Sequence, residues 1–270
     1  MLSVDDTGKP TLSMGVGDHQ DPAPELEEVL EAPARAAADR GLRLVVVFDE
    51  FQRIFDYESD LVERTLRSAV QAQAEAAYIF LGSRKHLIQK MLLDQSRPLY
   101  RSGGHYPLGP IAVEHWRPFI REHFEQGGRP IDASAIDRLC ALTDGHPFYT
   151  QHLCHAAWEL GESGRPTDAG VLEQALDLLL DRERHAYSAQ WESLAPNQRR
   201  LLTGLALEPP GQRLTSANFY ARHGISSASS VQRAVESLLA RDLIDRDNGS
   251  YLIADRFLRL WIRRELGGGR

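Results

Sequence analysis

The most constraining feature of this chain is a short apolar run that ends in two carboxylates. Residues 42–48 are almost all apolar and rich in valine, and Asp49 and Glu50 follow directly. Apolar runs of this kind are typical of strands that are covered on both faces of a parallel sheet. We therefore expect a buried strand with two adjacent acids at its C-terminal end. Parallel α/β sheets bind their ligands outside that end of the strands, so the acids occupy a place suited to a functional site.

The segments around this run alternate between helical and strand patterns. Helices are expected at Glu25–Arg40 (kinked at Pro33), at Ser59–Ala76 and around His86–Leu93. Further strands are expected at Ala77–Leu81 and near Tyr106–Pro110, and residues 1–24 are expected to form an irregular arm with a short strand at Thr11–Val16. This alternation is typical of βαβ units, so the first part of the chain is predicted to be an α/β domain with a parallel sheet.

The strand pattern disappears after Val113. Thr167 is predicted to cap a long helix at Asp168–Trp191. Three short helical patterns follow, and then a hairpin marked by Asn248-Gly249, in the order of a winged helix. The predicted domains are the arm at residues 1–24, an α/β core at 25–112, an all-α segment at 113–192 and a winged helix at 193–270.

Charge, cysteine and histidine spacing, and hydropathy argue against several classes of protein. The formal net charge of -7 gives no general attraction to nucleic acid, so such contact would need a local basic face. Cys140 and Cys154 lack partners at metal-ligand spacing and are expected to be buried and reduced. His152 and His155 lie three apart but have no third ligand at a convincing spacing. The chain has no membrane-spanning run and no signal-peptide pattern, so we expect a cytoplasmic protein.

The order of the two acids suits nucleotide hydrolysis. Asp49 can hold Mg²⁺ through the water shell of the ion, because Mg²⁺ prefers oxygen ligands and gives up water reluctantly. Glu50 can orient or deprotonate an attacking water. The same sequence also arises where an apolar strand simply ends in an acidic turn, so Val45–Glu50 alone leave both interpretations open.

Several segments together resemble the archaeal-type ATPases of the AAA+/STAND group of P-loop ATPases. Phe48-Asp49-Glu50-Phe51-Gln52 is similar to the Walker B segment, and Phe80-Leu81-Gly82-Ser83-Arg84 to the strand that carries sensor 1. Leu99-Tyr100-Arg101 resembles the segment before the fifth strand. Gly145-His146-Pro147-Phe148 resembles a Gly-x-Pro signature of the helical lid. The resemblance runs from about residue 25 to the C-terminus, which is similar to the winged helix that commonly follows the lid.

This resemblance implies a site for ATP and Mg²⁺ in an incomplete P-loop NTPase sheet followed by an all-α lid and a winged helix. Asp49 would support Mg²⁺, Glu50 would activate water, and Ser83 would hydrogen-bond the attacking water or the γ-phosphate. Arg101 would stabilise developing charge. Gly145 and Pro147 of the lid would shape the adenine pocket. The implied function is that of a nucleotide switch with a regulatory output.

The chain departs from the family because Gly-x-x-x-x-Gly-Lys-Ser/Thr, the Walker A loop, is absent. In P-loop ATPases the backbone N–H groups of this loop surround the phosphates, and its Lys and hydroxyl contact phosphate and Mg²⁺. The only Gly-Lys pair, Gly8-Lys9, is followed by proline and lacks the upstream glycine. We therefore expect a fragment of a longer protein, a degenerate relative, or a chain whose missing strand comes from a partner protein. We favour the fragment, and we do not expect these residues to hydrolyse ATP alone.

A function of another class is DNA binding through the winged helix, with the α/β part as a scaffold. The recognition helix would be Ser227–Arg241, and its exposed residues would be Ser229, Ser230, Gln232, Arg233 and Glu236. From residue 190 onward the chain holds twelve arginines and eight acidic residues, and Arg259, Arg263 and Arg264 would supply phosphate contacts. The resemblance implies instead a packing or regulatory module, which is the interpretation we favour.

Overall fold

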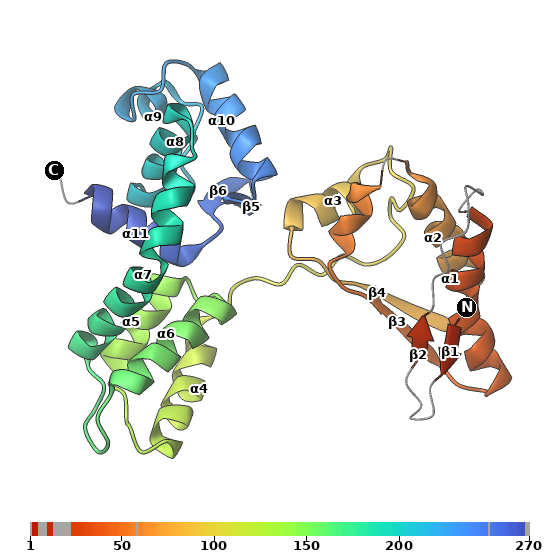
Figure 1. Cartoon of the computed structure of the whole chain (residues 1–270), viewed down its shortest axis with the longest axis horizontal. Helices are drawn as coiled ribbons and strands as arrows, with labels where there is room; N and C mark the ends of the chain where they lie inside the picture. The colour runs from red at the N-terminus through yellow and green to blue at the C-terminus, as the bar shows by residue number, and fades with distance from the viewer. Residues whose placement is uncertain (1, 5–9, 13–22, 58, 248, 268–270) are drawn as a thin grey trace. The chain divides into compact units, whose positions relative to one another are not determined.

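The chain forms two compact units in the computed structural model, which describes residues 2–4, 10–12, 23–57, 59–247 and 249–267 (Figure 1). The first unit spans residues 1–107 and the second spans residues 108–270. Each unit contains a hydrophobic cluster of its own. None of the described helices combines the length and hydrophobicity that crossing a bilayer requires.

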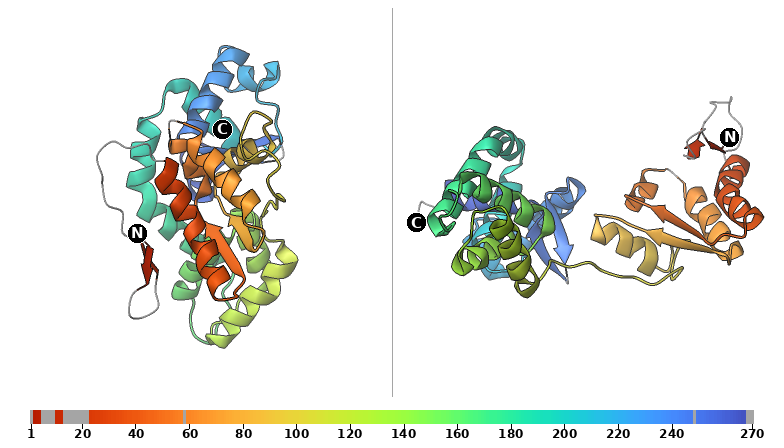
Figure 2. Two further views of the ribbon diagram at one scale, coloured as in Figure 1. Left: turned by 90° about the vertical axis from the view of Figure 1, so that its right-hand side faces the viewer. Right: turned by 90° about the horizontal axis from the view of Figure 1, so that it is seen from below.

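The first unit is built around a pair of parallel strands. Its elements are β1 (Leu2–Val4), β2 (Pro10–Leu12), α1 (Ala23–Asp39), β3 (Leu44–Phe48), the 3₁₀ helix η1 (Phe51–Asp56), α2 (Leu61–Ala72), β4 (Ala76–Phe80) and α3 (Lys85–Leu93). Strands β3 and β4 lie side by side, from Leu44 opposite Ala76 to Phe48 opposite Phe80 (Figure 2). Strands β1 and β2 form a separate antiparallel pair. The α/β character expected from the sequence is confirmed.

One face of the β3–β4 pair is packed against helices. The rings of Phe48 and Phe80 stack with their centroids 5.7 Å apart, and the ring of Phe51 lies 4.4 Å from that of Phe80. Leu66 of α2 and Met91 of α3 belong to the same cluster, and both helices lie on one side of the strands in Figure 1. Alternate residues of each strand therefore remove their side chains from water, as the period of two in a strand requires.

The other face of the pair is open, so the prediction of burial on both faces is wrong. The side chains of Val45, Val47 and Ile79 are 57%, 52% and 45% exposed. No third strand pairs with β3 or β4 in the part of the chain that the structure describes, so both outer edges of the pair are free there. Exposed apolar faces and unpaired strand edges are typical of surfaces that another element covers. We name Val45, Val47, Ala77 and Ile79 the open sheet face.

Two expected strands differ from the structure. Residues 106–110 have no regular secondary structure, and Tyr106 and Leu108 are exposed. A strand needs a neighbour to satisfy its backbone N–H and C=O groups, and no described strand pairs with this segment. Of the strand expected at Thr11–Val16, residues 11 and 12 belong to β2, and residues 13–16 lie outside the described residues.

The second unit is helical apart from one hairpin. Its elements are α4 (Val113–Gln126), α5 (Ala133–Thr143), α6 (Pro147–Leu160), α7 (Ala169–Glu192), α8 (Pro196–Leu207), α9 (Ala217–Arg222), α10 (Ala228–Ala240), β5 (Ile244–Asp247), β6 (Ser250–Ile253) and α11 (Arg256–Gly267). The strands β5 and β6 pair antiparallel, and Gly249 in their turn has a φ of 82°, which favours glycine. The hairpin expected at Asn248-Gly249 is confirmed, although Asn248 itself lies outside the described residues.

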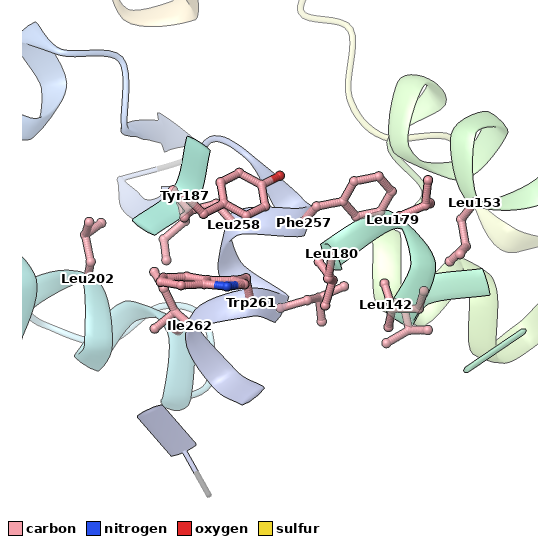
Figure 3. Packing of buried hydrophobic residues seen from close by; sticks show 14 of the residues in the cluster. Leu142, Leu153, Leu179, Leu180, Tyr187, Leu202, Phe257, Leu258, Trp261 and Ile262 are labelled. Carbon is pink, nitrogen blue, oxygen red and sulfur yellow. The ribbon is translucent and has the colours of Figure 1, made fainter. Parts of the chain in front are cut away.

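A single hydrophobic cluster joins the helices of the second unit. Figure 3 shows side chains of α5, α6 and α7 meeting those of α8 and α11. The ring centroids of Tyr187 and Trp261 lie 6.0 Å apart, and those of Tyr149 and Phe257 lie 5.0 Å apart. Because these contacts connect helices on both sides of residue 192, the α4–α7 helices and the C-terminal helices share one core.

Capping side chains fix the starts of two helices. Asp168, not the predicted Thr167, caps α7, because its carboxylate accepts a hydrogen bond from Val171 N at 3.0 Å. Thr167 is buried just before the helix. Ser227 caps α10 by accepting from Ser230 N at 3.2 Å. Ser230 is buried, so its predicted place on the exposed face of this helix is wrong.

Both cysteines are free thiols in the second unit. Cys140 is buried and Cys154 is partly buried. Burial raises the pKa of the Cys140 thiol to about 11 and that of the Cys154 thiol to about 12. Both thiols are therefore protonated at neutral pH, and the thiolate that reacts with electrophiles or metals is scarce.

Candidate functional site

The C-terminal ends of β3 and β4 lie next to each other. The pairing ends at Phe48 opposite Phe80, so the segments that follow the two strands leave from one edge of the sheet. Leu81 N donates to Phe48 O and Phe51 N donates to Leu81 O, each at 2.8 Å. These bonds bring the two predicted acids and the predicted sensor serine to the same edge.

Glu50, Gln52 and Ser83 form a closed set of hydrogen bonds at this edge, which we call the sheet-edge cluster. Ser83 Oγ donates to Glu50 Oε2 at 3.1 Å. Gln52 Nε2 donates to the same carboxylate oxygen and to Ser83 Oγ, the latter at 3.4 Å. Glu50 and Ser83 are thus brought together as the strand order predicts, and Gln52 joins them although the sequence analysis assigned it no part in the site.

The backbone of Glu50 is in the left-handed region, with φ 50° and ψ 39°. For a residue other than glycine this conformation costs about 1–2 kcal/mol. The Glu50 amide donates to Asp49 Oδ1 at 2.8 Å, and η1 begins at the next residue. Strained residues of this kind concentrate at functional sites, where the surrounding structure holds them in place. The turn directs the Glu50 side chain across the sheet edge toward Ser83.

Asp49 is the predicted Mg²⁺ residue and is exposed at the same edge. One of its carboxylate oxygens accepts the Glu50 amide, and the other makes no hydrogen bond within the described chain. No group of three or more His, Cys, Asp or Glu residues is placed to hold a metal among the described residues. A lone exposed carboxylate fits Mg²⁺, which keeps most of its water and takes only one or two protein carboxylates.

Arg101 lies in the turn that follows α3 and does not contact the sheet-edge cluster. Its guanidinium carbon lies 5.1 Å from the ring centroid of Tyr100. Arg67 of α2 holds this turn by donating to the Tyr100 carbonyl oxygen at 3.1 Å. Among the described residues, no hydrogen bond or ion pair joins Arg101 to Glu50 or Ser83. The structure therefore does not bring this predicted residue together with the other two.

Gly145 and Pro147 form the turn between α5 and α6 in the second unit. Pro147 is the first residue of α6, where its fixed φ is favourable and no amide donor is needed. Gly145 has a φ of 65°, and a Cβ at this position would lie 2.2 Å from Ile111 O. Its carbonyl oxygen accepts from Ile111 N and from the Trp116 indole, both at 3.1 Å. The turn requires a glycine at position 145 and favours a proline at position 147, and the part of both residues in an adenine pocket stays a prediction.

Comparisons with known proteins bear on the fold of both units. Residues 185–264 match a family model described as a probable winged helix domain. The structure of a Walker-type ATPase of Pyrococcus abyssi is similar with a TM-score of 0.61 and 19% identity, over 88% of this chain and 68% of that chain. The fold of this chain is therefore similar to that of a Walker-type ATPase. The ATPase fold and the C-terminal winged helix expected from the sequence are therefore confirmed.

A second solved structure matches with a lower score. The ORC2 protein of Aeropyrum pernix, solved in ADPNP-ADP complexes, matches with a TM-score of 0.40 and 11% identity, over 94% of this chain and 73% of that chain. No curated protein matches this chain.

An ion-pair cluster connects the α5–α6 turn to α11. Arg256 Nε and Arg259 Nη1 lie 3.0 Å and 2.7 Å from one carboxylate oxygen of Asp144. The two arginine side chains are only 12% and 13% exposed, whereas that of Asp144 is 40% exposed. Burial lowers the pKa of the Arg256 guanidinium, and the Asp144 charge opposes this effect. We call these three residues the Asp144 latch.

The other late arginines also contact the chain itself. Arg263 Nε donates to Ala206 O, and Arg264 pairs with Glu173 and Asp177. The exposed face of α10 carries one cation, Arg233, beside Glu236. The arginines that the sequence analysis assigned to phosphate contact are thus engaged within the second unit, which weighs against the DNA surface proposed for them.

Asp144→Ala is expected to destabilise the second unit by about 2 kcal/mol. Removing one partner of a fully buried ion pair costs about 3–5 kcal/mol, because the remaining charge is left uncompensated, and the partial exposure of Asp144 reduces that figure. Chemical denaturation followed by tryptophan fluorescence measures the effect. Asp137→Ala is the matched control, since Asp137 pairs with Arg117 on the surface at 2.7 Å and such pairs contribute little. Equal stability of the two variants would contradict a structural role for the latch.

Proposed function

We propose that this protein is a nucleotide-linked regulatory protein of the AAA+/STAND type whose sheet edge acts on ATP. The observation that carries this proposal is the convergence of Glu50 and Ser83 at the C-terminal edge of a parallel strand pair within a Walker-type ATPase fold. That edge is the ligand-binding edge of parallel α/β sheets. The left-handed backbone of Glu50 supports the proposal, because strain of this kind is kept at functional sites.

Each residue at the edge has chemistry suited to this function. The Asp49 carboxylate would hold the hydrated Mg²⁺, which neutralises phosphate charge when MgATP is bound. Glu50 would accept a proton from, or orient, the attacking water. Ser83 would hydrogen-bond that water or the γ-phosphate. Arg101 remains a candidate for charge stabilisation only if its turn moves toward the cluster.

The phosphates themselves need a Walker A loop that these 270 residues do not contain. We propose that a strand–loop–helix segment carrying Gly-x-x-x-x-Gly-Lys-Ser/Thr joins the sheet, either from further sequence of the same gene or from a partner protein. The open sheet face and the free strand edges support this, because an added strand and helix would cover both. We refer to the chain with such a segment as the completed protein.

The winged helix is proposed as the regulatory output. The Asp144 latch lies directly before Gly145, where the family resemblance expects the adenine pocket, and it holds α11 through Arg256 and Arg259. A nucleotide that bound this turn would change the environment of Asp144 and thereby bias the packing of α11. Two packing states with different nucleotide affinity would make the protein a switch.

Val47→Lys in the completed protein is expected to weaken MgATP binding about tenfold or more. A buried valine contributes at least about 1.5 kcal/mol, and a lysine in its place would oppose docking of an added segment on the open sheet face. Calorimetric titration with MgATP measures the affinity. Val29→Lys on the exposed side of α1 is the matched control. Equal affinities of the two variants would show that the open sheet face is not where the segment docks.

A further inference from the structure

Gln52 is buried at the centre of the sheet-edge cluster although its side chain is polar. It lies in η1 and is only 4% exposed. An ionised carboxylate only accepts hydrogen bonds, so the amide atom that faces Glu50 Oε2 is the donor Nε2 rather than Oε1. The same Nε2 lies 3.4 Å from Ser83 Oγ. The amide therefore directs both of its N–H bonds at the two groups to which the proposed function assigns the chemistry.

The other end of the Gln52 amide has no hydrogen-bond partner. Its Oε1 is buried and unpaired among the described residues. A Cβ on Gly82 would lie 2.5 Å from this oxygen and 2.6 Å from Ile88 Cδ1, so only a glycine leaves room for it. A buried acceptor without a partner lowers stability, and an apolar side chain of similar shape avoids that cost. Stability alone therefore does not explain why a glutamine occupies this position.

We propose that Gln52 is a positioning residue that holds the Glu50 carboxylate and the Ser83 hydroxyl in one arrangement at the sheet edge. Glu50 is exposed, so its long side chain would otherwise sample several rotamers in water. The Gln52 amide limits that freedom from the buried side of the cluster, and Ser83 completes the set at 3.1 Å. Catalytic groups work best when neighbouring side chains lock their rotamers before the substrate binds. The inference rests on the proposed function, because it assigns the orientation of the carboxylate proposed to act on water.

The arrangement itself is tested on the 270-residue chain by NMR relaxation of the Glu50 side chain. In the wild type we expect a rigid side chain, and in Gln52→Leu an order parameter below about 0.6, the flexible range. Gln52→Glu should behave in the same way, because it keeps the shape but removes the donor. Gln73→Leu is the matched control: Gln73 Nε2 donates to Leu30 O at 3.0 Å in the same unit, away from the cluster. A Glu50 side chain equally rigid in Gln52→Leu and in the wild type would overturn the inference.

Thermal unfolding separates positioning from a structural role. Because Gln52→Leu removes an unpaired buried acceptor, we expect its Tm to equal or exceed that of the wild type. The inference would fail if Gln52→Leu lost much of its Tm while the control Gln73→Leu did not. Gln52 would then serve packing rather than the positioning of Glu50.

Kinetics of the completed protein provide the second readout. Gln52→Leu should lower kcat about 10²-fold, as small misplacements of catalytic groups do. It should leave the KM for ATP within about twofold, because the Gln52 side chain is buried beneath Glu50 and Ser83. If the wild type shows no hydrolysis, the proposed function fails, while the NMR result still decides whether Gln52 orders Glu50. Unchanged kcat in a hydrolysing protein would overturn the positioning role.

Discussion

Glu50→Gln in the completed protein is expected to keep ATP binding and to lower the hydrolysis rate about 10²- to 10⁴-fold, the usual contribution of a positioned general base. The substitution preserves the shape of the side chain. Its carbonyl oxygen can still accept from Ser83 and Gln52, so the sheet-edge cluster should stay intact. What is lost is the negative charge that accepts a proton from water. Phosphate release under saturating MgATP measures kcat, and calorimetry measures binding.

The control for this prediction is Glu75→Gln, which removes one exposed carboxylate from the same unit before β4. Both variants change the net charge equally, so a difference between them reports the position of Glu50 and not the electrostatics of the surface. Turnover in Glu50→Gln equal to that in Glu75→Gln would remove Glu50 from the mechanism, whatever the state of Asp49 or Ser83.

Gly145→Ala is expected to destabilise the second unit by about 2–5 kcal/mol. The left-handed backbone contributes about 1–2 kcal/mol. The added methyl would meet Ile111 O, where the Cβ distance is 2.2 Å, and overpacking of this kind costs about 1–3 kcal/mol. A unit of this size should then show a fall in Tm of roughly 5–15 °C.

Gly128→Ala is the matched control for the steric part of this effect. Gly128 has a φ of 69°, but no atom lies within 4 Å of the position of a Cβ. It should therefore show only the backbone cost of about 1–2 kcal/mol. Equal losses at the two glycines would contradict the close approach of the Gly145 turn to Ile111. If Gly145→Ala kept its stability but lost nucleotide affinity, the main role of Gly145 would instead be to bind the ligand.

Local sequence patterns predicted the helices and strands well, but they predicted less well which side chains are buried. The valine run forms β3, and Asn248-Gly249 marks the turn of the β5–β6 hairpin, because these signals depend on neighbouring residues alone. Burial of the valines on both faces depends on elements elsewhere in the sheet. Val45 and Val47 are exposed because nothing in the described chain covers that side. The same dependence on a neighbour explains why residues 106–110 do not form a strand.

The site could be predicted as far as strand order dictates it. Asp49, Glu50 and Ser83 follow two parallel strands, so their meeting at one edge follows from topology. The segment that resembles Walker B includes Gln52, but the sequence analysis assigned it no role, since a polar residue two positions after an acid gives no sign that it is buried. The sequence signal that could have shown its burial is its place between the apolar residues Phe51 and Ile54, both of which are buried in the structure. The ion pairs of Arg256 and Arg259 could not be predicted either, because their partner Asp144 is more than a hundred residues away in the sequence.

The central claim is that the sheet edge binds nucleotide only when a Walker A segment completes it. The measurement that tests this most directly is calorimetric titration of MgATP into the 270-residue chain and, in parallel, into the completed protein. We predict measurable binding by the completed protein and none by the 270-residue chain. Tight binding of MgATP by the 270-residue chain would contradict the account.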